Sequence, residues 1–426
     1  MPGATLRTAT LGCKVNQYET EFVRESLLNH GFREPDTDEP ADLCVVNTCT
    51  VTNEGDAKSR QLIRRLGREN PDARIVVMGC YATRAPEEIR TLPNVAEVVT
   101  DKREIPDLLG RLGVVDIPTG IARFGDRHRA YVKVQDGCLL RCSYCIIPQV
   151  RPQLTSRPVT HILEEVQRLV SNGYREIVLT GIHLGHYGVD WNVNQPKSAW
   201  LRLADLVRRL AELPGNFRLR LSSIEATEVT RELIGVLAEY PDKICPHLHI
   251  CLQSGSNSVL RRMRRRWCTK RLTDRCELVK QTLKLPAITT DVIVGFPGES
   301  DSEFQETCDM VRRIGFSKIH IFPFSPRQTT PAAEMDDQVP SQIKAERGGR
   351  LRQIESELRS RYFHKLIGRR LRVLVESADN QQQNRFTGTS CRYAPVQVTA
   401  SSLVAGEFVD VIASTADETG IVGSVK

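Results

Sequence analysis

The segment VQDGCLLRCSYC, residues 134–145, places three cysteines, Cys138, Cys142 and Cys145, at C-x3-C-x2-C spacing. Three thiolates from one loop can hold a cubane iron–sulfur cluster at three of its irons and leave the fourth iron open to a small ligand. A structural zinc site needs four ligands, often from a second C-x2-C or H-x3-5-H pair, and no such pair lies nearby in the sequence. The spacing therefore favours an iron–sulfur cluster over zinc.

Length and composition predict a folded protein with more than one domain. The chain has 426 residues, of which 40% are hydrophobic and 26% charged, as in ordinary globular proteins. It has no apolar run of about 18 residues that could span a bilayer, and its amino terminus lacks a basic segment followed by an apolar stretch. We therefore expect a cytoplasmic location without membrane contact, in which the 13 cysteines stay reduced or bind metal rather than form disulfides.

Positive charge is concentrated in the middle of the chain, where residues 121–362 carry 37 Lys and Arg against 27 Asp and Glu. Apolar residues repeat at helical spacing through the most basic part of this region, so its arginines occupy the other face of a helix. They are candidates for binding the phosphates of RNA, although an ordinary solvated helix face has the same composition. These arginines are Arg261, Arg262, Arg264, Arg265 and Arg266.

Residues 1–120 alternate strand-like and helical segments, which predicts an amino-terminal Rossmann-like parallel α/β domain. Its expected strands are residues 8–11, 43–47, 74–78 and 97–100. The first three are each followed closely by a cysteine, namely Cys13, Cys49 and Cys80. Because loops at the carboxyl ends of parallel strands share one edge of the sheet, these thiols should converge and hold a second cluster. Alternatively they are small buried residues, as we expect for Cys44 inside the second strand.

Residues 121–362 continue the alternation with a longer period, which predicts an open (β/α)6 partial barrel. Its expected strands are residues 130–134, 177–180, 218–222, 249–252, 289–294 and 318–324. Barrel chemistry takes place at the carboxyl ends of the strands, where this chain has Gly181, Ser223, Glu225 and Gln253. A glycine there is often only a turn residue, and a single histidine such as His183 is more often structural. Residues 363–426 contain short alternating runs that predict a small antiparallel β-barrel domain.

Several further segments are characteristic of one enzyme family. They are TLGCKVNQYE at 10–19, NTCTVT at 47–52, MGCYA at 78–82, LQSGS at 252–256 and DVIVGFPGE at 291–299. With the three-cysteine signature at 138–145, they make the whole chain resemble the radical S-adenosylmethionine methylthiotransferases, and the terminal β domain is placed like the TRAM domain of that family. Within the family, GCKVN at 12–16 and TCTVT at 48–52 are most similar to the MtaB subfamily.

The resemblance implies a tRNA substrate, in which N6-threonylcarbamoyladenosine beside the anticodon exchanges its adenine C2 hydrogen for a methylthio group. It implies two 4Fe–4S clusters, one held by Cys138, Cys142 and Cys145 and the other by Cys13, Cys49 and Cys80. S-adenosylmethionine would bind the open iron of the first cluster and be cleaved to a deoxyadenosyl radical, while a second molecule would methylate the sulfur delivered by the second cluster. The residues implied to line the S-adenosylmethionine pocket are Tyr144, Gly181, Ser223, Glu225 and Gln253. An electron donor and a sulfur source are implied as further partners.

Other functions are compatible with the same residues. A family member of this kind could methylthiolate an aspartate of a ribosomal protein, or isopentenyladenosine in tRNA. A more distant alternative is a non-enzymatic metal-binding RNA module, in which the cysteines hold zinc.

Overall fold

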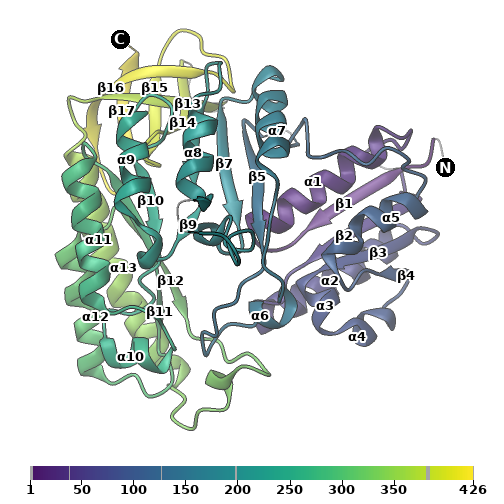
Figure 1. Cartoon of the computed structure of the whole chain (residues 1–426), viewed down its shortest axis with the longest axis horizontal. Helices are drawn as coiled ribbons and strands as arrows, with labels where there is room; N and C mark the ends of the chain where they lie inside the picture. The colour runs from purple at the N-terminus through teal and green to yellow at the C-terminus, as the bar shows by residue number, and fades with distance from the viewer. Residues whose placement is uncertain (1–2, 38, 126, 197–198, 380–383, 426) are drawn as a thin grey trace.

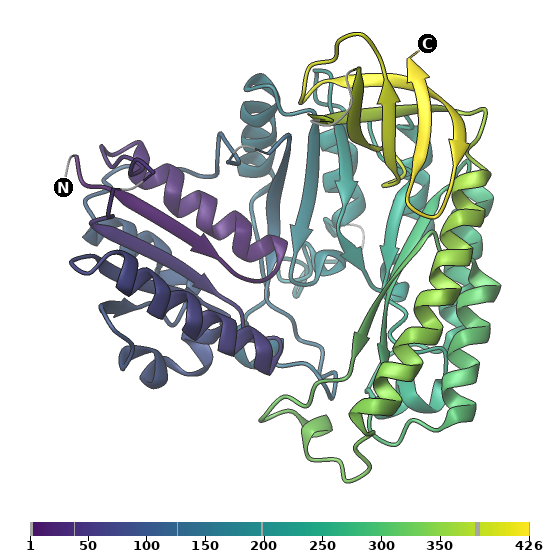
Figure 2. The same ribbon diagram turned by 180° about the vertical axis from the view of Figure 1, so that it is seen from behind.

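The computed structural model describes residues 3–37, 39–125, 127–196, 199–379 and 384–425. They form an amino-terminal sheet, a partial barrel and a small closed barrel (Figure 1). The view from behind in Figure 2 shows the amino-terminal sheet beside the partial barrel and the small closed barrel at the amino-terminal ends of the partial barrel's strands. Within the described ranges, no helix is both long enough and apolar enough to cross a membrane.

The amino-terminal sheet consists of four parallel strands in sequence order. These strands are β1 (Leu6–Thr10), β2 (Leu43–Thr48), β3 (Arg74–Gly79) and β4 (Val95–Val98). One face is covered by α1 (Lys14–Leu28) and α5 (Ile105–Arg111), and the other by α2 (Asn53–Glu69), α3 (Cys80–Arg84) and α4 (Pro86–Arg90). Because helices cover both faces, β2 is buried along its whole length, and its sequence LCVVNT does not alternate between apolar and polar residues. The predicted parallel α/β organisation is confirmed.

The partial barrel is built from two four-stranded sheets, ordered β6-β5-β7-β8 and β12-β11-β10-β9. Every pair is parallel except β5 with β6. Ser222 alone separates β8 from β9, so the two sheets form one curved wall, as the sequence predicted. The strands are β5 (Arg129–Asp136), β6 (Thr155–Ser156), β7 (Glu176–Gly181), β8 (Arg218–Leu221), β9 (Ser223–Ile224), β10 (His247–Ile250), β11 (Ala287–Val294) and β12 (Lys318–Pro323). The fourth expected strand, residues 249–252, therefore begins earlier, at His247.

Helices cover the outer face of this wall (Figure 1) and bury a large apolar core against it. Several polar side chains, among them Ser222, Ser223 and Asp291, line the cavity on the concave face. The longer helices are α7 (Val159–Ser171), α8 (Leu203–Ala211), α9 (Arg231–Glu239), α11 (Thr269–Thr282), α12 (Asp301–Ile314) and α13 (Ser341–His364). The short ones are α6 (Ile147–Val150), α10 (Asn257–Arg262), η1 (Lys102–Glu104), η2 (Leu184–His186), η4 (Ala226–Glu228) and η5 (Pro331–Ala333).

The small carboxyl-terminal barrel closes in the order β13-β14-β15-β17-β16. Its strands are β13 (Arg370–Ala378), β14 (Arg385–Ser390), β15 (Pro395–Thr399), β16 (Phe408–Ala416) and β17 (Ile421–Val425). The predicted barrel is confirmed, but β15 and β17 pair in parallel, whereas the other pairs are antiparallel. Tyr362 and Phe363, at the end of α13, pack into its core. The expected boundary between residues 362 and 363 thus falls inside the last turn of α13, and the domain limits 1–120, 121–362 and 363–426 stay a prediction.

Candidate active site

The loop with Cys138, Cys142 and Cys145 follows β5, at the carboxyl end of the barrel strands. It begins at Gly137, whose φ of +78° suits glycine and whose hypothetical Cβ would lie 1.8 Å from the carbonyl oxygen of Gln153. The backbone N–H of Cys138 donates to the Arg151 carbonyl across 3.2 Å. A glycine at 137 therefore lets the loop pack tightly against residues 151–153, which places its thiols beside the barrel.

Cationic side chains contact two sulfurs of this loop. Nη1 of Arg265 donates to Sγ of Cys142 across 3.2 Å, and Nδ1 of His183 lies 3.6 Å from Sγ of Cys138. Burial lowers the pKa of His183, but its contacts with Cys138 and Glu228 prevail and raise the pKa to about 9. Burial raises the pKa of Cys142, and the positive charge of Arg265 opposes this effect in favour of the thiolate, the form that binds metal. His183, which the sequence suggested was structural, thus touches a candidate ligand.

Cys13, Cys49 and Cys80 meet at the carboxyl edge of the amino-terminal sheet, after β1, β2 and β3 respectively. A Cβ built on Gly12 would lie 3.2 Å from Sγ of Cys49, so the first two loops touch. Burial is the main cause that raises the pKa of Cys13 and of Cys49, and the charge of Cys80 raises both further. The structure therefore brings together the three thiols that the sequence placed at strand ends.

Gly79 fixes the position of Cys80 in this triplet. Its φ is +102°, and a Cβ at this position would lie 2.4 Å from both Oδ1 of Asn47 and the Thr48 carbonyl oxygen. Glycine therefore allows β3 to pass close to β2 before α3 begins with Cys80. Cys44, in contrast, lies inside β2 in the apolar core, away from this edge.

The spacing of the sulfur atoms suits clusters better than single ions. Among the described residues, two groups of three His, Cys, Asp or Glu side chains have ligand atoms all within 4.8 Å of one another, and neither group is one of the cysteine triplets. A zinc ion bound at about 2.3 Å by tetrahedral thiolates would hold their sulfurs only about 3.8 Å apart. A cubane takes one thiolate at each of three irons and so accommodates wider spacing. The residues of each triplet are thus chemically suited to a 4Fe–4S cluster, and their role as its ligands stays a prediction.

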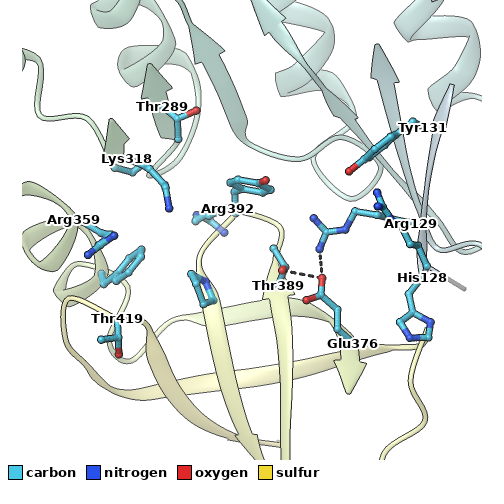
Figure 3. Close-up of a pocket in the computed structure, with 15 residues that line it drawn as sticks. His128, Arg129, Tyr131, Thr289, Lys318, Arg359, Glu376, Thr389, Arg392 and Thr419 are labelled. Atoms are coloured by element: carbon cyan, nitrogen blue, oxygen red, sulfur yellow. Dashed lines mark hydrogen bonds and ion pairs between the residues drawn. The ribbon is translucent and has the colours of Figure 1, made fainter. Parts of the chain in front are cut away.

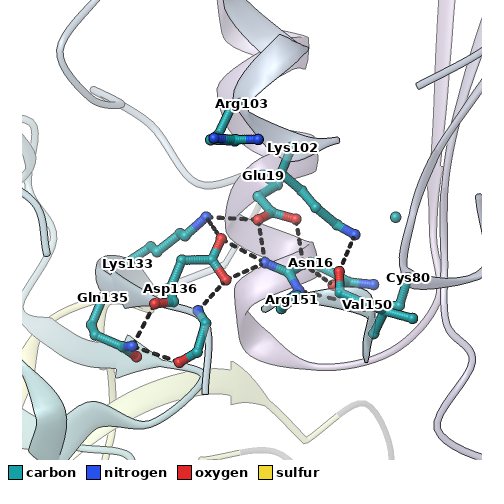
Figure 4. Close-up of polar contacts among 12 residues, drawn as sticks. Asn16, Glu19, Cys80, Lys102, Arg103, Lys133, Gln135, Asp136, Val150 and Arg151 are labelled. Atoms are coloured by element: carbon teal, nitrogen blue, oxygen red, sulfur yellow. Dashed lines mark hydrogen bonds and ion pairs between the residues drawn. The ribbon is translucent and has the colours of Figure 1, made fainter. Parts of the chain in front are cut away.

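Arg151 joins the two cysteine regions (Figure 4). Its buried guanidinium donates to Sγ of Cys80 across 3.4 Å, to Glu19 across 2.8 Å and to Asp136 across 2.8 Å. Burial raises the pKa of Glu19, but Arg151 and Lys133 outweigh it and hold this pKa at about 2. Because Glu19 lies on α1 and Asp136 ends β5, this network fixes the amino-terminal sheet against the partial barrel.

The residues expected to line the S-adenosylmethionine pocket gather at the same end of the barrel. Glu225 accepts hydrogen bonds from Arg265 and, across 2.9 Å, from Nε1 of Trp267. The Tyr144 hydroxyl lies 3.5 Å from Nη1 of Arg265. Arg265 therefore contacts Cys142, Tyr144 and Glu225 together, whereas its place in a basic run had predicted only RNA binding.

The other expected pocket residues lie on neighbouring strand ends. Gly181 ends β7, where a Cβ would approach Oε1 of Gln135 to 2.9 Å. Ser223 is exposed at the start of β9. Gln253 has φ of +61°, a strained conformation for a non-glycine residue, of the kind that clusters at functional sites. Their role in cofactor binding stays a prediction.

The five arginines that were candidates for RNA binding differ in exposure and in their ion pairs. Arg265 is buried at its guanidinium, as described above. Arg262 forms an ion pair with Glu303 across 2.7 Å. Arg261, Arg264 and Arg266 are exposed, and for these three RNA binding stays a prediction.

Two cavities adjoin the amino-terminal sheet, the partial barrel and the small barrel. The central cavity has a volume of about 520 Å³, and its lining includes Cys13, Lys14, Ser223 and Asp291. The basic cavity has a volume of about 620 Å³ and lies between the partial and small barrels (Figure 3). Both are lined by Arg129, Tyr131, Thr289 and Tyr393, so they are contiguous. The carboxyl edge of the amino-terminal sheet thus opens into a space that continues toward the small barrel.

Comparison with known proteins gives two family matches. Residues 5–101 match the model described as uncharacterized protein family UPF0004, and residues 132–311 match the radical SAM superfamily. Among solved structures, the fold is similar to that of the radical S-adenosylmethionine methyltransferase TsrM from Kitasatospora setae. The TM-score is 0.54 at 14% identity, over 78% of this chain and 77% of that one.

Similar sequences cover nearly the whole chain. The threonylcarbamoyladenosine tRNA methylthiotransferase MtaB of Bacillus subtilis (strain 168) is 41% identical over 96% of this chain and 93% of its own. The protein of the same name from Chlamydia pneumoniae is 37% identical over 99% and 98%. The tRNA-2-methylthio-N(6)-dimethylallyladenosine synthase of Aquifex aeolicus (strain VF5) is 32% identical over 87% and 88%. This chain therefore belongs to the radical S-adenosylmethionine methylthiotransferase family that includes the MtaB proteins.

Proposed function

We propose that this chain transfers a methylthio group to C2 of N6-threonylcarbamoyladenosine in tRNA. The observation that carries the proposal is the pair of cysteine triplets, because Arg151 links Cys80 of one triplet to Asp136 beside the other, and Cys13 lines the central cavity. The names of the relatives supply the substrate. Two separate three-thiol sites suit a reaction that needs both a radical and a sulfur atom. A non-enzymatic metal-binding module would need only one such site.

The adenine C2–H bond offers no leaving group, so acid–base side chains cannot open it and cofactors have to supply the reactivity. When bound, S-adenosylmethionine and two 4Fe–4S clusters would supply the radical, the sulfur and the methyl group. Cys138, Cys142 and Cys145 would hold one cluster, and Cys13, Cys49 and Cys80 the other. Charge-assisted hydrogen bonds from Arg265 to Cys142 and from Arg151 to Cys80 would orient and tune these ligands.

The pocket residues Tyr144, Glu225 and Ser223 would bind the polar parts of S-adenosylmethionine. A carboxylate such as Glu225 suits an ammonium group, and hydroxyl groups such as that of Ser223 suit a ribose. Glu225 is paired with Arg265 in this structure, and the Arg265 guanidinium also contacts Cys142. Arg265 thus contacts both Glu225 and the cysteine loop, and so fixes their positions relative to each other.

The substrate nucleotide would reach the central cavity from an anticodon loop, whose unpaired bases can be splayed out without melting a helix. The basic cavity supports contact with the RNA backbone beside this entry (Figure 3). Arg127, Lys318, Arg359 and Arg392 line it, with Glu376 as its acidic residue. Backbone phosphates favour such clustered cations. We further propose that the protein acts in the cytoplasm with an electron donor and a sulfur source, because methylthiolation of tRNA consumes electrons and sulfur.

Mass spectrometry of tRNA nucleosides from cells with and without the gene tests the proposal. Loss of the methylthio form of N6-threonylcarbamoyladenosine on deletion is the expected result. Anaerobic reconstitution supplies a second test, with that tRNA, isopentenyladenosine tRNA and ribosomal protein offered side by side. Transfer only to the ribosomal protein would overturn the RNA assignment, and zinc without acid-labile sulfide would overturn the radical chemistry.

A further inference from the structure

Lys14 is a lysine of the central cavity that forms no ion pair with any residue that the structure describes. It follows Cys13 directly, begins α1 and lies half-buried in the cavity lining. Within the described part of the chain, its ammonium group has no hydrogen-bond or ion-pair partner. The other strong cations of this cavity are already paired, Arg220 with Glu176 across 2.9 Å and Arg129 with Glu376. Among the described residues, Lys14 is therefore the unpaired strong cation of this cavity, and the charge of Asp291 acts on it from the same lining without a direct contact.

Two further side chains of the cavity have buried polar atoms without partners among the described residues. They are Oγ of Ser222 and Nδ1 of His247, in residues that are only 7% and 5% exposed. A buried polar atom without a hydrogen bond costs free energy, which a bound polar ligand can recover. The central cavity is thus suited to a ligand with several polar groups in addition to an anionic group.

The proposed substrate matches this description. The threonylcarbamoyl group on N6 carries a carboxylate, a hydroxyl and ureido N–H groups, whereas a dimethylallyl group carries none of these. Adenine C2 has to lie toward Cys13, and a cavity of about 520 Å³ is large enough for the base together with its N6 substituent. Because C2 and C6 belong to the same ring, the substituent stays within reach of the residues beside Cys13.

We propose that the ammonium group of Lys14 binds the carboxylate of the threonylcarbamoyl group and so selects this nucleoside over those with an apolar N6 substituent. This inference rests on the proposed function and assigns the substrate specificity of the proposed reaction to one side chain. Asp291, which lines the same cavity near His249, is an acceptor for the hydroxyl or ureido hydrogens. Lys14 would act on substrate choice and not on the formation of the radical.

The test measures the affinity of the reconstituted holoenzyme for anticodon stem-loops that differ only at the modified base. The bases are N6-threonylcarbamoyladenosine, its methyl ester and unmodified adenosine, and the proteins are wild type, Lys14→Met, Lys14→Arg and the exposed control Lys58→Met. We expect wild type, Lys14→Arg and Lys58→Met to bind the acid at least about tenfold more tightly than the ester. Lys14→Met should bind acid and ester equally, with unchanged affinity for the unmodified loop.

Iron and acid-labile sulfide are measured on each protein, because Lys14 is next to a candidate ligand. If Lys14→Met fails to load clusters, Lys14→Gln takes its place, because it also removes the charge while keeping a polar side chain, and it should likewise bind acid and ester equally. Equal binding of acid and ester by wild type would overturn the inference, as would a preserved preference in loaded Lys14→Met. The same wild-type preparation is assayed for methylthio product, so that absence of product counts against the proposed function and not against Lys14 alone.

Discussion

Nε of Arg151 donates a hydrogen bond to the Cys80 sulfur across 3.4 Å, although the two residues are 71 positions apart. The same guanidinium binds Glu19 on α1 and Asp136 at the end of β5. One side chain thus contacts a candidate cluster ligand and holds the amino-terminal sheet against the partial barrel. Changing it should alter both the chemistry of one cluster and the packing of two parts of the chain.

Replacing Arg151 with methionine should lower the reduction potential of the cluster held by Cys13, Cys49 and Cys80. A cationic hydrogen bond to a ligand sulfur stabilises the more negative, reduced state, so its loss makes reduction harder. The change also leaves Glu19 and Asp136 with less compensation in a buried site, which should cost about 3–5 kcal/mol of unfolding free energy. A redox titration followed by electron paramagnetic resonance and a denaturant titration measure the two effects.

Arg151→Lys is the matched control for charge. It keeps the positive charge but loses the planar guanidinium group, whose nitrogen atoms reach three partners. It should retain more stability than Arg151→Met. A potential that stays at the wild-type value in both variants would contradict the proposed contact with the cluster.

Changing each cysteine triplet to alanine should separate the two halves of the reaction. Without Cys138, Cys142 and Cys145, no deoxyadenosine should form from S-adenosylmethionine, because no thiolates remain to hold the radical cluster. Without Cys13, Cys49 and Cys80, deoxyadenosine should still form but no methylthio product should appear. Chromatography of both products from one anaerobic reaction measures this, with Cys44→Ala as the control for a buried cysteine outside both triplets. Thiolation by the second variant would remove that triplet from the mechanism.

Gly79→Ala should reduce the iron bound per chain and destabilise the fold. The new Cβ meets Oδ1 of Asn47 and the Thr48 carbonyl oxygen at 2.4 Å, and the backbone has φ of +102°. Strain of this kind costs about 1–3 kcal/mol before any collision is added. Gly113→Ala is the matched control, because its φ of +96° is similar but no atom lies within 4 Å of its Cβ position. Equal iron loss in the two variants would show that strain alone, and not the position of Cys80, matters.

Glu176 should make the chain sensitive to acid. Burial raises the pKa of this carboxyl, but Arg220 and Arg218 outweigh it and hold the pKa far below its usual range. Because the folded pKa is lower than the unfolded value of about 4.3, the stabilisation is complete at neutral pH and is lost as the pH falls below that value. Thermal unfolding between neutral pH and pH 3 should show this loss in the wild type and a smaller one in Glu176→Gln.

Glu176→Gln should also be less stable at neutral pH by about 3–5 kcal/mol, because it leaves two buried arginines with less compensation. Nη1 of Arg218 donates to the Arg372 carbonyl across 2.7 Å, so the change should loosen the small barrel as well. Glu54→Gln, which removes an exposed pair with Lys58, is the control and should leave the acid response nearly unchanged. A wild-type acid response in Glu176→Gln would show that other carboxyls govern it.

Much of the chain organisation could be predicted because it depends on local pattern. Runs of apolar residues indicated the strands, and parallel strands bring their carboxyl ends to one edge, which is why Cys13, Cys49 and Cys80 could be grouped from sequence. The predictions were wrong where a neighbouring strand determines the first residue of a strand or the direction in which two strands pair. The start of β10 at His247 and the parallel pairing of β15 with β17 depend on neighbouring strands, whose identity a single segment does not encode.

The sequence by itself determined the two sets of three thiols, the alternation of strands and helices, and the glycines before the cysteines, because these depend on spacing along the chain. Only the tertiary structure decided that Arg151 reaches Cys80, that Arg265 is buried against Cys142 and Glu225, and that Lys14 lines a cavity without a partner among the described residues. Contacts of this kind join residues from separate parts of the chain. They arise from how the amino-terminal sheet, partial barrel and small barrel pack together, and the periodicity of a sequence carries no information about the direction of a side chain across such an interface.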